Sequence, residues 1–349
     1  MKMAGLRLFG CAALCLNLSA VLAEGYPLAE NVDLIGEPGS VTAVYEDTLV
    51  DLARIHRLGY EEIRLANPDV DTWLPGDGTE VMLPTQYILP NTVRTGLVVN
   101  LSEYRMYYYY QDDGRKYVLT FPISIGRMDW GTPLGLASVV AKVKNPDWYP
   151  PQSIREEHLA DGRGELARRV PAGPDNPLGD YAMRLSIPGY LIHGTNRPAG
   201  VGMRVTHGCI RMFPEDIEWL FPKIPVKTQV RLINQPYKLG WSGNDLYLEV
   251  HPPLEEGSTA EEDASGEIVA EDDGVPVEEA TVAEDPDAWS MTRITELYIK
   301  VTEDRPAIVD WELVEQVYEE RLGVPVKVGR AKGQLPDDYE SAITVSNAL

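Results

Sequence analysis

Three side chains in the middle of the chain have the types and the spacing needed for nucleophilic catalysis. Cys209 follows His207 by two positions and His193 by sixteen. The other two cysteines, Cys11 and Cys15, lie in an N-terminal segment that we interpret as a removable leader, so the mature chain keeps one thiol. An imidazole beside a thiol can accept its proton, lower its pKa and generate the reactive thiolate. The pattern therefore indicates a cysteine nucleophile with a histidine base.

Two other interpretations of these residues remain open on the sequence alone. Cys209 could be buried and inert, with His193 and His207 hydrogen-bonded in the core, because free cysteine is among the most buried residue types. The three side chains could instead bind zinc, although the chain has no paired Cys-x-x-Cys and no His-Glu-x-x-His motif.

The sequence on either side of these residues predicts how they are held. Leu191 and Ile192 end an apolar run that favours a strand, and this strand would present His193 at its edge. Gly208 lacks a Cβ, which leaves room for close backbone approach beside Cys209. We therefore expect the histidine at a strand end and the cysteine in a tight loop.

Several further motifs accompany these residues. The full set is Gly131-Thr132-Pro133-Leu134-Gly135, Lys144-Asn145-Pro146-Asp147-Trp148, Asn176-Pro177-Leu178-Gly179, His193-Gly194-Thr195-Asn196, Thr206-His207-Gly208-Cys209-Ile210-Arg211-Met212 and Pro214-Glu215-Asp216-Ile217. This set resembles the signature of the YkuD-type L,D-transpeptidases, in particular the Gram-negative periplasmic group, over about residues 95 to 254. The resemblance implies a mainly β protein, with a catalytic domain of β-sandwich or barrel type at residues 95–233.

The resemblance also implies a reaction. Enzymes of this family attack a peptidoglycan tetrapeptide stem at the bond between the L-centre of a diamino acid and the terminal D-Ala. Cys209 would then hold the stem as a thioester until an amine accepts it. His193 is implied as the base, oriented by the backbone carbonyl of Gly194, and no metal or organic cofactor is needed. The amides of Gly208 and Cys209, helped by His207, are implied as oxyanion donors.

Three more residues are expected to contact the substrate or its loop. Arg211 can pair with a substrate carboxylate or brace the loop, and Thr206 and Asn196 stand in the same motifs. The acceptor amine is open between a second stem peptide and the lysine of an outer-membrane lipoprotein. Two other functions also remain open: hydrolysis at the same site, as an L,D-carboxypeptidase or endopeptidase, and a non-catalytic scaffold that binds peptidoglycan.

The N-terminal segment has the pattern of a secretory signal peptide over residues 1–23. Lys2 and Arg7 precede an apolar run from Leu8 to Leu22 that is short for a membrane span, and Ala23 ends a small-residue cleavage site. No later segment approaches the roughly 18 uninterrupted apolar residues of a membrane span. We therefore expect export to the periplasm without a transmembrane anchor.

Residues 41–85 predict a small β-α-α-β module. We expect Asp47 to cap a first helix, and a second helix to run from Tyr60 to Ala66. The segments Asp47-Thr48-Leu49, Ala66-Asn67-Pro68, Pro75-Gly76 and Leu83-Pro84 resemble a LysM domain, a glycan-binding module of cell-wall proteins. Glu46 stands where that family usually has glycine, and a structural cap on the catalytic domain is the alternative.

The catalytic segment predicts several short strands rich in valine, tyrosine and isoleucine. Asp113-Gly114 between two of them is a strong hairpin turn. The run Tyr107-Tyr108-Tyr109-Tyr110 favours a packed strand over an exposed stacking platform, because aromatic residues are common in strands. Residues 145–176 have weak periodicity and predict a long loop that covers the active site as a lid.

The remainder of the chain predicts three segments. Residues 234–254 form a β-hairpin extension, and residues 289–349 form a C-terminal helical segment whose second helix is capped by Asp310 and stopped by Gly323. Residues 255–288, between them, carry 14 Asp and Glu and no Lys or Arg, so we expect a disordered acidic linker. This linker accounts for most of the net charge of −23, and no basic stripe is present to bind nucleic acid.

Overall fold

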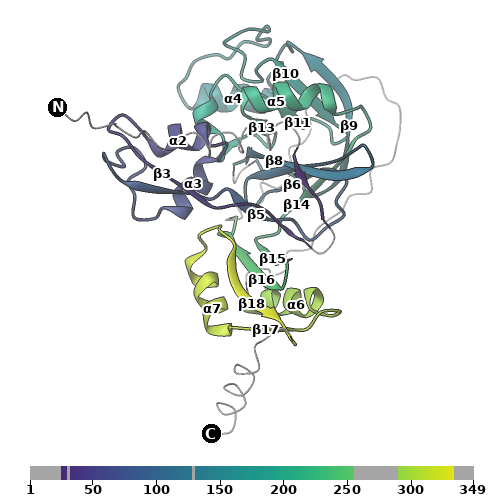
Figure 1. Ribbon diagram of the computed structural model, residues 1–349. Coiled ribbons are helices and arrows are strands. Elements are labelled where there is room, and N and C mark those ends of the chain that lie inside the picture. Colours follow the sequence, from purple (N-terminus) through teal and green to yellow (C-terminus); the bar gives the residue numbers. More distant parts are fainter. Residues whose placement is uncertain (1–24, 30–31, 128–129, 255–289, 334–349) are drawn as a thin grey trace, which may run out of the picture.

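The computed structural model describes residues 25–29, 32–127, 130–254 and 290–333. The signal peptide and the acidic linker expected from the sequence lie outside these residues. Figure 1 shows three parts: an N-terminal unit of short strands and two helices, a central β-structure, and a C-terminal unit of strands and helices. Within the described ranges, no helix has the length and apolar character needed to cross a membrane.

The central part is a closed β-barrel of eight strands in the order β8-β13-β11-β10-β9-β14-β6-β7, because β7 also pairs with β8. The strands of the ring are β6 (Gly96–Asn100), β7 (Arg105–Asp112), β8 (Arg115–Gly126), β9 (Gly135–Lys144), β10 (Tyr181–Leu185), β11 (Leu191–His193), β13 (Ile210–Met212) and β14 (Gln229–Ile233). Two more strands, β1 (Tyr26–Pro27) and β12 (Arg204–Thr206), pair with β8. Of the two expected architectures, sandwich and barrel, the structure shows the barrel.

Alternating side chains of β7 pack into two different apolar clusters. Tyr107 and Tyr109 are buried in a cluster shared with the N-terminal unit, whereas Tyr108 and Tyr110 pack against the apolar cluster of the barrel. Successive residues of a strand point to opposite faces, which explains the division. The tyrosine run is therefore a packed strand, as predicted.

The β7–β8 hairpin turns at the predicted position. Asp112 pairs with Arg115, which leaves Asp113 and Gly114 as a two-residue loop with φ angles of 44° and 77°. Positive φ at both loop positions is the requirement of a type I′ turn, whose twist suits the flanking strands. The turn prediction is confirmed.

The N-terminal unit has two helices between paired strands. Its elements are β2 (Leu34–Gly36), β3 (Gly39–Thr42), α2 (Leu49–Ile55), α3 (Tyr60–Ala66), β4 (Glu80–Leu83) and β5 (Gln86–Ile88), with β3 paired to β4 and β2 paired to β5. The predicted helix cap is wrong by one residue, because Thr48 and not Asp47 accepts from the Asp51 amide, at 3.1 Å. Asp47 instead accepts from the Val44 amide at 2.8 Å and closes the turn before the helix.

This unit packs on the segment that leads to Cys209. The Tyr60 amide donates to the Val201 carbonyl at 3.0 Å. A Cβ on Gly202 would lie 2.2 Å from the Tyr60 nitrogen, so only glycine permits this approach. The contact therefore fixes the start of the stretch that runs through β12 to the thiol.

The segments after the barrel form one mixed α/β unit, which corrects the expected hairpin extension followed by a helical segment. Its elements are β15 (Tyr237–Ser242), β16 (Asp245–Val250), α6 (Met291–Val301), β17 (Ala307–Val309), α7 (Trp311–Glu320) and β18 (Val326–Ala331), with sheet order β15-β16-β18-β17. The sequence interpretation missed β17 because it is only three residues long. It missed β18 because this strand pairs across the acidic linker, with Gly329 opposite Leu246.

The boundaries of α7 agree with the prediction at one end only. Asp310 caps the helix and accepts from the Leu313 amide at 3.1 Å, as expected. The helix ends at Glu320 because Arg321 adopts a left-handed conformation with φ of 51°. The predicted stop at Gly323 is therefore two residues too late.

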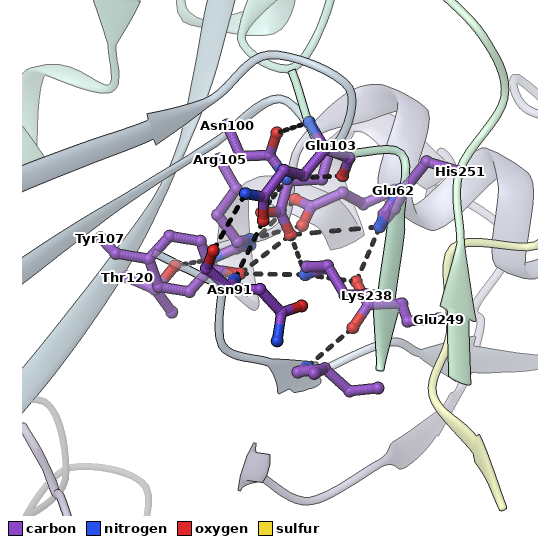
Figure 2. Close-up of polar contacts among 12 residues, drawn as sticks. Glu62, Asn91, Asn100, Glu103, Arg105, Tyr107, Thr120, Lys238, Glu249 and His251 are labelled. Carbon is purple, nitrogen blue, oxygen red and sulfur yellow. Dashed lines mark hydrogen bonds and ion pairs between the residues drawn. The ribbon is translucent and has the colours of Figure 1, made fainter. Parts of the chain in front are cut away.

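A buried ionic cluster joins the three parts (Figure 2). Lys238 of β15 pairs with Glu249 of β16 at 2.7 Å and also with Glu103 of the barrel. Glu249 accepts in addition from the Ile88 amide of the N-terminal unit at 2.7 Å. Burial lowers the pKa of Lys238, but the two carboxylates outweigh burial and raise the pKa above its ordinary value. The cluster therefore stays charged and holds the units in one arrangement.

Truncation after Pro253 tests whether the C-terminal segments form one unit. The truncated chain loses β17, β18 and both helices, so Leu246 and Leu248 of β16, which are fully buried, lose their covering side chains. We expect amide hydrogen exchange in β15 and β16 to become at least about 10-fold faster than in the full chain.

A matched control keeps every residue and carries an inserted protease site in the acidic linker. After cleavage, the two pieces should stay associated and the exchange rates of β15 and β16 should not change. Equal protection in the truncated and full chains would contradict the assignment of these segments to one unit.

Candidate active site

Two short parallel strands place the candidate residues. Ile192 of β11 pairs with Ile210 of β13, and His193 pairs with Arg211. Paired residues point to the same face of a sheet, and successive residues point to opposite faces. Ile192 and Ile210 are buried in the barrel core. The side chains of His193, Arg211 and Cys209, which stands two positions before Arg211, therefore share the other face.

That face opens into a cavity of about 350 Å³. The predicted site residues that line it are His193, Asn196, Thr206, His207, Cys209 and Arg211. The other two, Gly194 and Gly208, are backbone neighbours of these residues and do not line the cavity. The structure therefore brings six of the eight predicted residues to one place.

The segment predicted as a lid covers this cavity and contains a helix that the sequence interpretation missed. Its side chains in the cavity wall are Trp148, Ile154, His158, Arg163, Leu166, Val170 and Asp175. The helix, α4 (Gln152–Ala160), has no buried residue, so no apolar stripe marks it in the sequence. The buried Asn176 amide donates to the Pro146 carbonyl at 2.8 Å and ties the two ends of the lid together.

His193 is held as a neutral base. Its Nδ1 lies 2.6 Å from the carbonyl oxygen of Gly194. Since a carbonyl only accepts, Nδ1 carries the proton and Nε2 keeps its lone pair. Burial, followed by the nearby charge of Arg211, lowers the pKa of His193 to about 3. The imidazole is therefore uncharged at neutral pH and can accept a proton through Nε2.

Cys209 keeps its proton at rest. Its Sγ lies 3.7 Å from the carbonyl oxygen of Gly189. Burial raises the pKa of the thiol to about 11, against smaller lowering effects from the Leu191 backbone and from Arg211. The expected lowering of the thiol pKa by an adjacent imidazole is wrong for this arrangement, because a neutral imidazole supplies no positive charge.

The loop before Cys209 is pinned by two threonines. Thr132 Oγ1 donates to the Gly208 carbonyl at 2.8 Å, and Thr206 Oγ1 donates to the Cys209 carbonyl at 2.6 Å. Gly208 has a φ of 93°, and a Cβ there would lie 2.6 Å from a ring carbon of Tyr190, so only glycine fits. In a trans peptide the N–H points away from the carbonyl, so the contact with Thr132 turns the Cys209 amide to the opposite side.

His207 is held from the lid. Its Nε2 lies 2.8 Å from the carboxylate of Glu157 on α4, and the same carboxylate pairs with Arg127 at 2.7 Å. The ring of Trp130 meets the imidazole edge-on, with centroids 5.2 Å apart. Burial lowers the pKa of His207, and Glu157 opposes this effect. Sequence reasoning missed Glu157 and Arg127, because no motif links them to the histidine.

Asn196 and Arg211, both expected to contact the substrate, differ in their surroundings. Asn196 Nδ2 donates to the Pro174 carbonyl at 3.3 Å, so its amide contacts the lid. Arg211 is partly buried, and its Nε has no hydrogen-bond partner among the described residues. Arg211 therefore does not brace the loop through Nε, and its side chain remains available to the cavity.

The geometry does not support a zinc site at the thiol. Within the part of the chain that the structure describes, the one group of three or more donor atoms that all lie within 4.8 Å of one another belongs to Glu103, Glu249 and His251. This group does not include the cysteine or the histidines of the cavity. The amine of Lys238 already pairs with both carboxylates of the group and so compensates their negative charge.

Known proteins resemble this chain in sequence. Residues 94–232 match the YkuD family, the L,D-transpeptidase catalytic domain. The chain is 40% identical over 266 residues to the probable L,D-transpeptidase YbiS of Escherichia coli, which covers 75% of this chain and 84% of the relative. The chain belongs to the YkuD family of L,D-transpeptidases. The resemblance drawn from the motifs is thus confirmed, and the protein is a cysteine-dependent enzyme of this family.

Other L,D-transpeptidases extend the comparison. The probable L,D-transpeptidase ErfK/SrfK of Salmonella typhimurium is 36% identical over 316 residues, which covers 89% of this chain and 93% of the relative. The NMR structure of the catalytic domain of the Enterococcus faecium L,D-transpeptidase is 22% identical, has a TM-score of 0.31, and covers 41% of this chain and 100% of that domain. The family assignment rests on the sequence relatives.

The pH dependence of acylation separates the two histidines. The His193 pKa of about 3 lies below its ordinary value, so the base is lost only as pH falls through about 3. The wild-type rate should therefore be flat from about pH 5 to about pH 9. In His193→Ala the rate should rise tenfold per pH unit until the thiol ionises near its pKa of about 11. His207→Ala should be slower by about 100-fold at every pH, because it misplaces the loop and leaves the base intact.

The measurement is the rate of thioester formation on a tetrapeptide donor, followed by mass spectrometry across the pH range. Alkaline recovery of His207→Ala, together with a flat and slow profile of His193→Ala, would mean that the two roles are assigned the wrong way round.

Proposed function

We propose that this L,D-transpeptidase removes the terminal D-Ala from a peptidoglycan tetrapeptide stem and transfers the acyl group to an amine. One observation carries the proposal: the neutral His193, with Nε2 free to accept, shares a strand face with Cys209 inside a covered cavity. A neutral thiol beside a neutral imidazole suits a nucleophile that loses its proton as it attacks.

Acylation starts at the neutral pair. The Nε2 of His193 accepts the thiol proton while Cys209 Sγ attacks the carbonyl carbon of the L-centre, and the carbonyl electron pair moves to oxygen. When the oxyanion collapses, the C–N bond breaks and the imidazolium gives its proton to the leaving nitrogen. D-Ala departs as a neutral amine and the stem remains as a thioester. The carbonyl of Gly194 holds the ring in place and stabilises the transient imidazolium.

The loop before the nucleophile supports the negative charge on oxygen. We assign the donors as the amides of Gly208 and Cys209. The contact of Thr132 with the Gly208 carbonyl fixes the peptide plane that carries the Cys209 amide. His207 shapes this loop and does not donate to the oxyanion. With Nε2 donating to Glu157, the neutral imidazole has no second N–H to offer.

The thioester is resolved by an uncharged amine. The amine attacks the thioester carbonyl, His193 takes the excess amine proton, and the departing Cys209 sulfur recovers a proton from the imidazolium. We favour the lysine of an outer-membrane lipoprotein as acceptor, because residues 240–253 resemble the extension of Gram-negative periplasmic members. The signal-peptide pattern at residues 1–23 supports the periplasm as the compartment.

Product analysis tests the reaction and the acceptor together. Purified protein is incubated with a labelled tetrapeptide stem and a lipoprotein C-terminal peptide, and the products are identified by mass spectrometry. We expect release of D-Ala and an amide bond to the lysine, and Cys209→Ala should form no product while its circular dichroism stays unchanged. A stem-to-stem product would change the acceptor, a free tripeptide would indicate hydrolysis, and turnover by Cys209→Ala would contradict the mechanism.

The N-terminal unit offers a second contact with the cell wall. Tyr45, Trp73 and Leu74 are 81%, 61% and 77% exposed. The Leu49 amide donates to the Thr72 carbonyl at 2.9 Å, which holds the two loops that carry these side chains next to each other. Exposed aromatic side chains grouped in this way are typical of binding surfaces. We propose that they contact the glycan strand.

Substitution on this surface separates wall binding from catalysis. Trp73→Ala should weaken cosedimentation with purified peptidoglycan by about 5-fold or more, because it removes a stacking surface. Acylation by a soluble stem should be unchanged. Leu136→Ala, at an apolar barrel position that is 57% exposed, is the matched control and should bind like wild type. Equal binding of the Trp73 variant and wild type would leave the unit as a structural cap.

A further inference from the structure

Two arginine side chains line the cavity without an acidic partner. Arg211 shares the strand face of the thiol, and Arg197 enters the cavity wall from the turn after β11. In the ranges that the structure describes, neither guanidinium forms an ion pair, and the buried Nε of Arg211 has no hydrogen-bond partner. Asp175 also lines the cavity but does not reach either arginine within ion-pair distance.

The two positive charges act on each other. Burial, followed by the charge of Arg197, lowers the pKa of Arg211, against a smaller raising effect from Cys209. Other arginines nearby have carboxylate partners, such as Arg127 with Glu157 at 2.7 Å. Two adjacent cations in a cavity, one of them partly buried, favour an anionic ligand, because a buried charge needs a counter-charge.

We infer that Arg197 and Arg211 together bind the free carboxylate of the terminal D-residue of the donor peptide. This inference rests on the proposed function, which supplies the peptide. Planar guanidinium groups bind carboxylates through paired N–H···O contacts, so two of them can enclose one carboxylate. The enzyme would therefore recognise the end of its substrate by charge.

The positions of the residues suit this carboxylate. Arg211 lies two residues along the strand from Cys209, which is about 6–7 Å at the backbone. The carboxylate of the leaving residue lies one residue, about 3.5 Å, beyond the attacked carbonyl. The long arginine side chain spans the difference. Bonds in the interior of a peptide carry no such carboxylate, so this site favours release of a terminal residue over endopeptidase cleavage.

The experiment compares three tetrapeptide donors with wild-type enzyme: the free acid, the peptide amidated at its terminal carboxylate, and the peptide amidated at the side-chain carboxylate of its diamino acid. Terminal amidation should lower kcat/KM for acylation by about 10- to 100-fold, and side-chain amidation should change it by less than about 3-fold. Equal kcat/KM for the free acid and the terminal amide would overturn the inference. A loss confined to the side-chain amide would assign the arginines to the other carboxylate and also overturn it.

Arginine variants test which side chains bind the terminal carboxylate. Arg211→Gln and Arg197→Gln should acylate slowly and should no longer distinguish the free acid from the terminal amide. Arg163→Gln is the matched control: Arg163 lines the same cavity but pairs with Asp161 at 2.6 Å, so this variant should keep the discrimination. Discrimination that survives in both test variants would overturn the inference. Failure of wild type to acylate the free acid would instead count against the proposed function itself.

Discussion

The parallel pairing of β11 with β13 is the constraint on which the active site depends. It sets Ile192 and Ile210 in the barrel core, and it thereby forces the next residues to the opposite face. His193 at the end of β11 and Cys209 immediately before β13 therefore both line the cavity. A shift of one strand by one residue in this register would turn its side chains to the opposite face and separate the histidine from the cysteine.

His193 and Cys209 are both neutral at rest because the fold buries them. Burial favours the uncharged form of both groups, so the pKa of His193 falls to about 3 and that of Cys209 rises to about 11. The lid supplies part of this environment, and Glu157 on α4 connects it to the loop before the thiol. The buried cluster around Lys238 fixes the outer units on the barrel, and the N-terminal unit also contacts the segment that leads to Cys209.

The sequence predicted correctly those features that are determined by residues adjacent in the chain. The Asp113-Gly114 turn and the Asp310 cap need only nearby backbone groups, and both are as expected. The predictions that were wrong or missing concern features that depend on distant residues. The thiol pKa depends on burial, and β18 depends on a partner strand before the acidic linker. The contact of Glu157 with His207 joins residues 50 positions apart, with no pattern in the sequence to show it.

The ionisation state of the Cys209 thiol tests the central claim most directly. Thiolate absorbance in the ultraviolet can be titrated in a chain that starts after Ala23, with Cys209→Ala as the blank for tyrosine ionisation. The account predicts no thiolate at neutral pH and a midpoint near the thiol pKa of about 11. A thiolate already present at pH 7 that disappears together with protonation changes of His193 would contradict it, because it would show a resting ion pair.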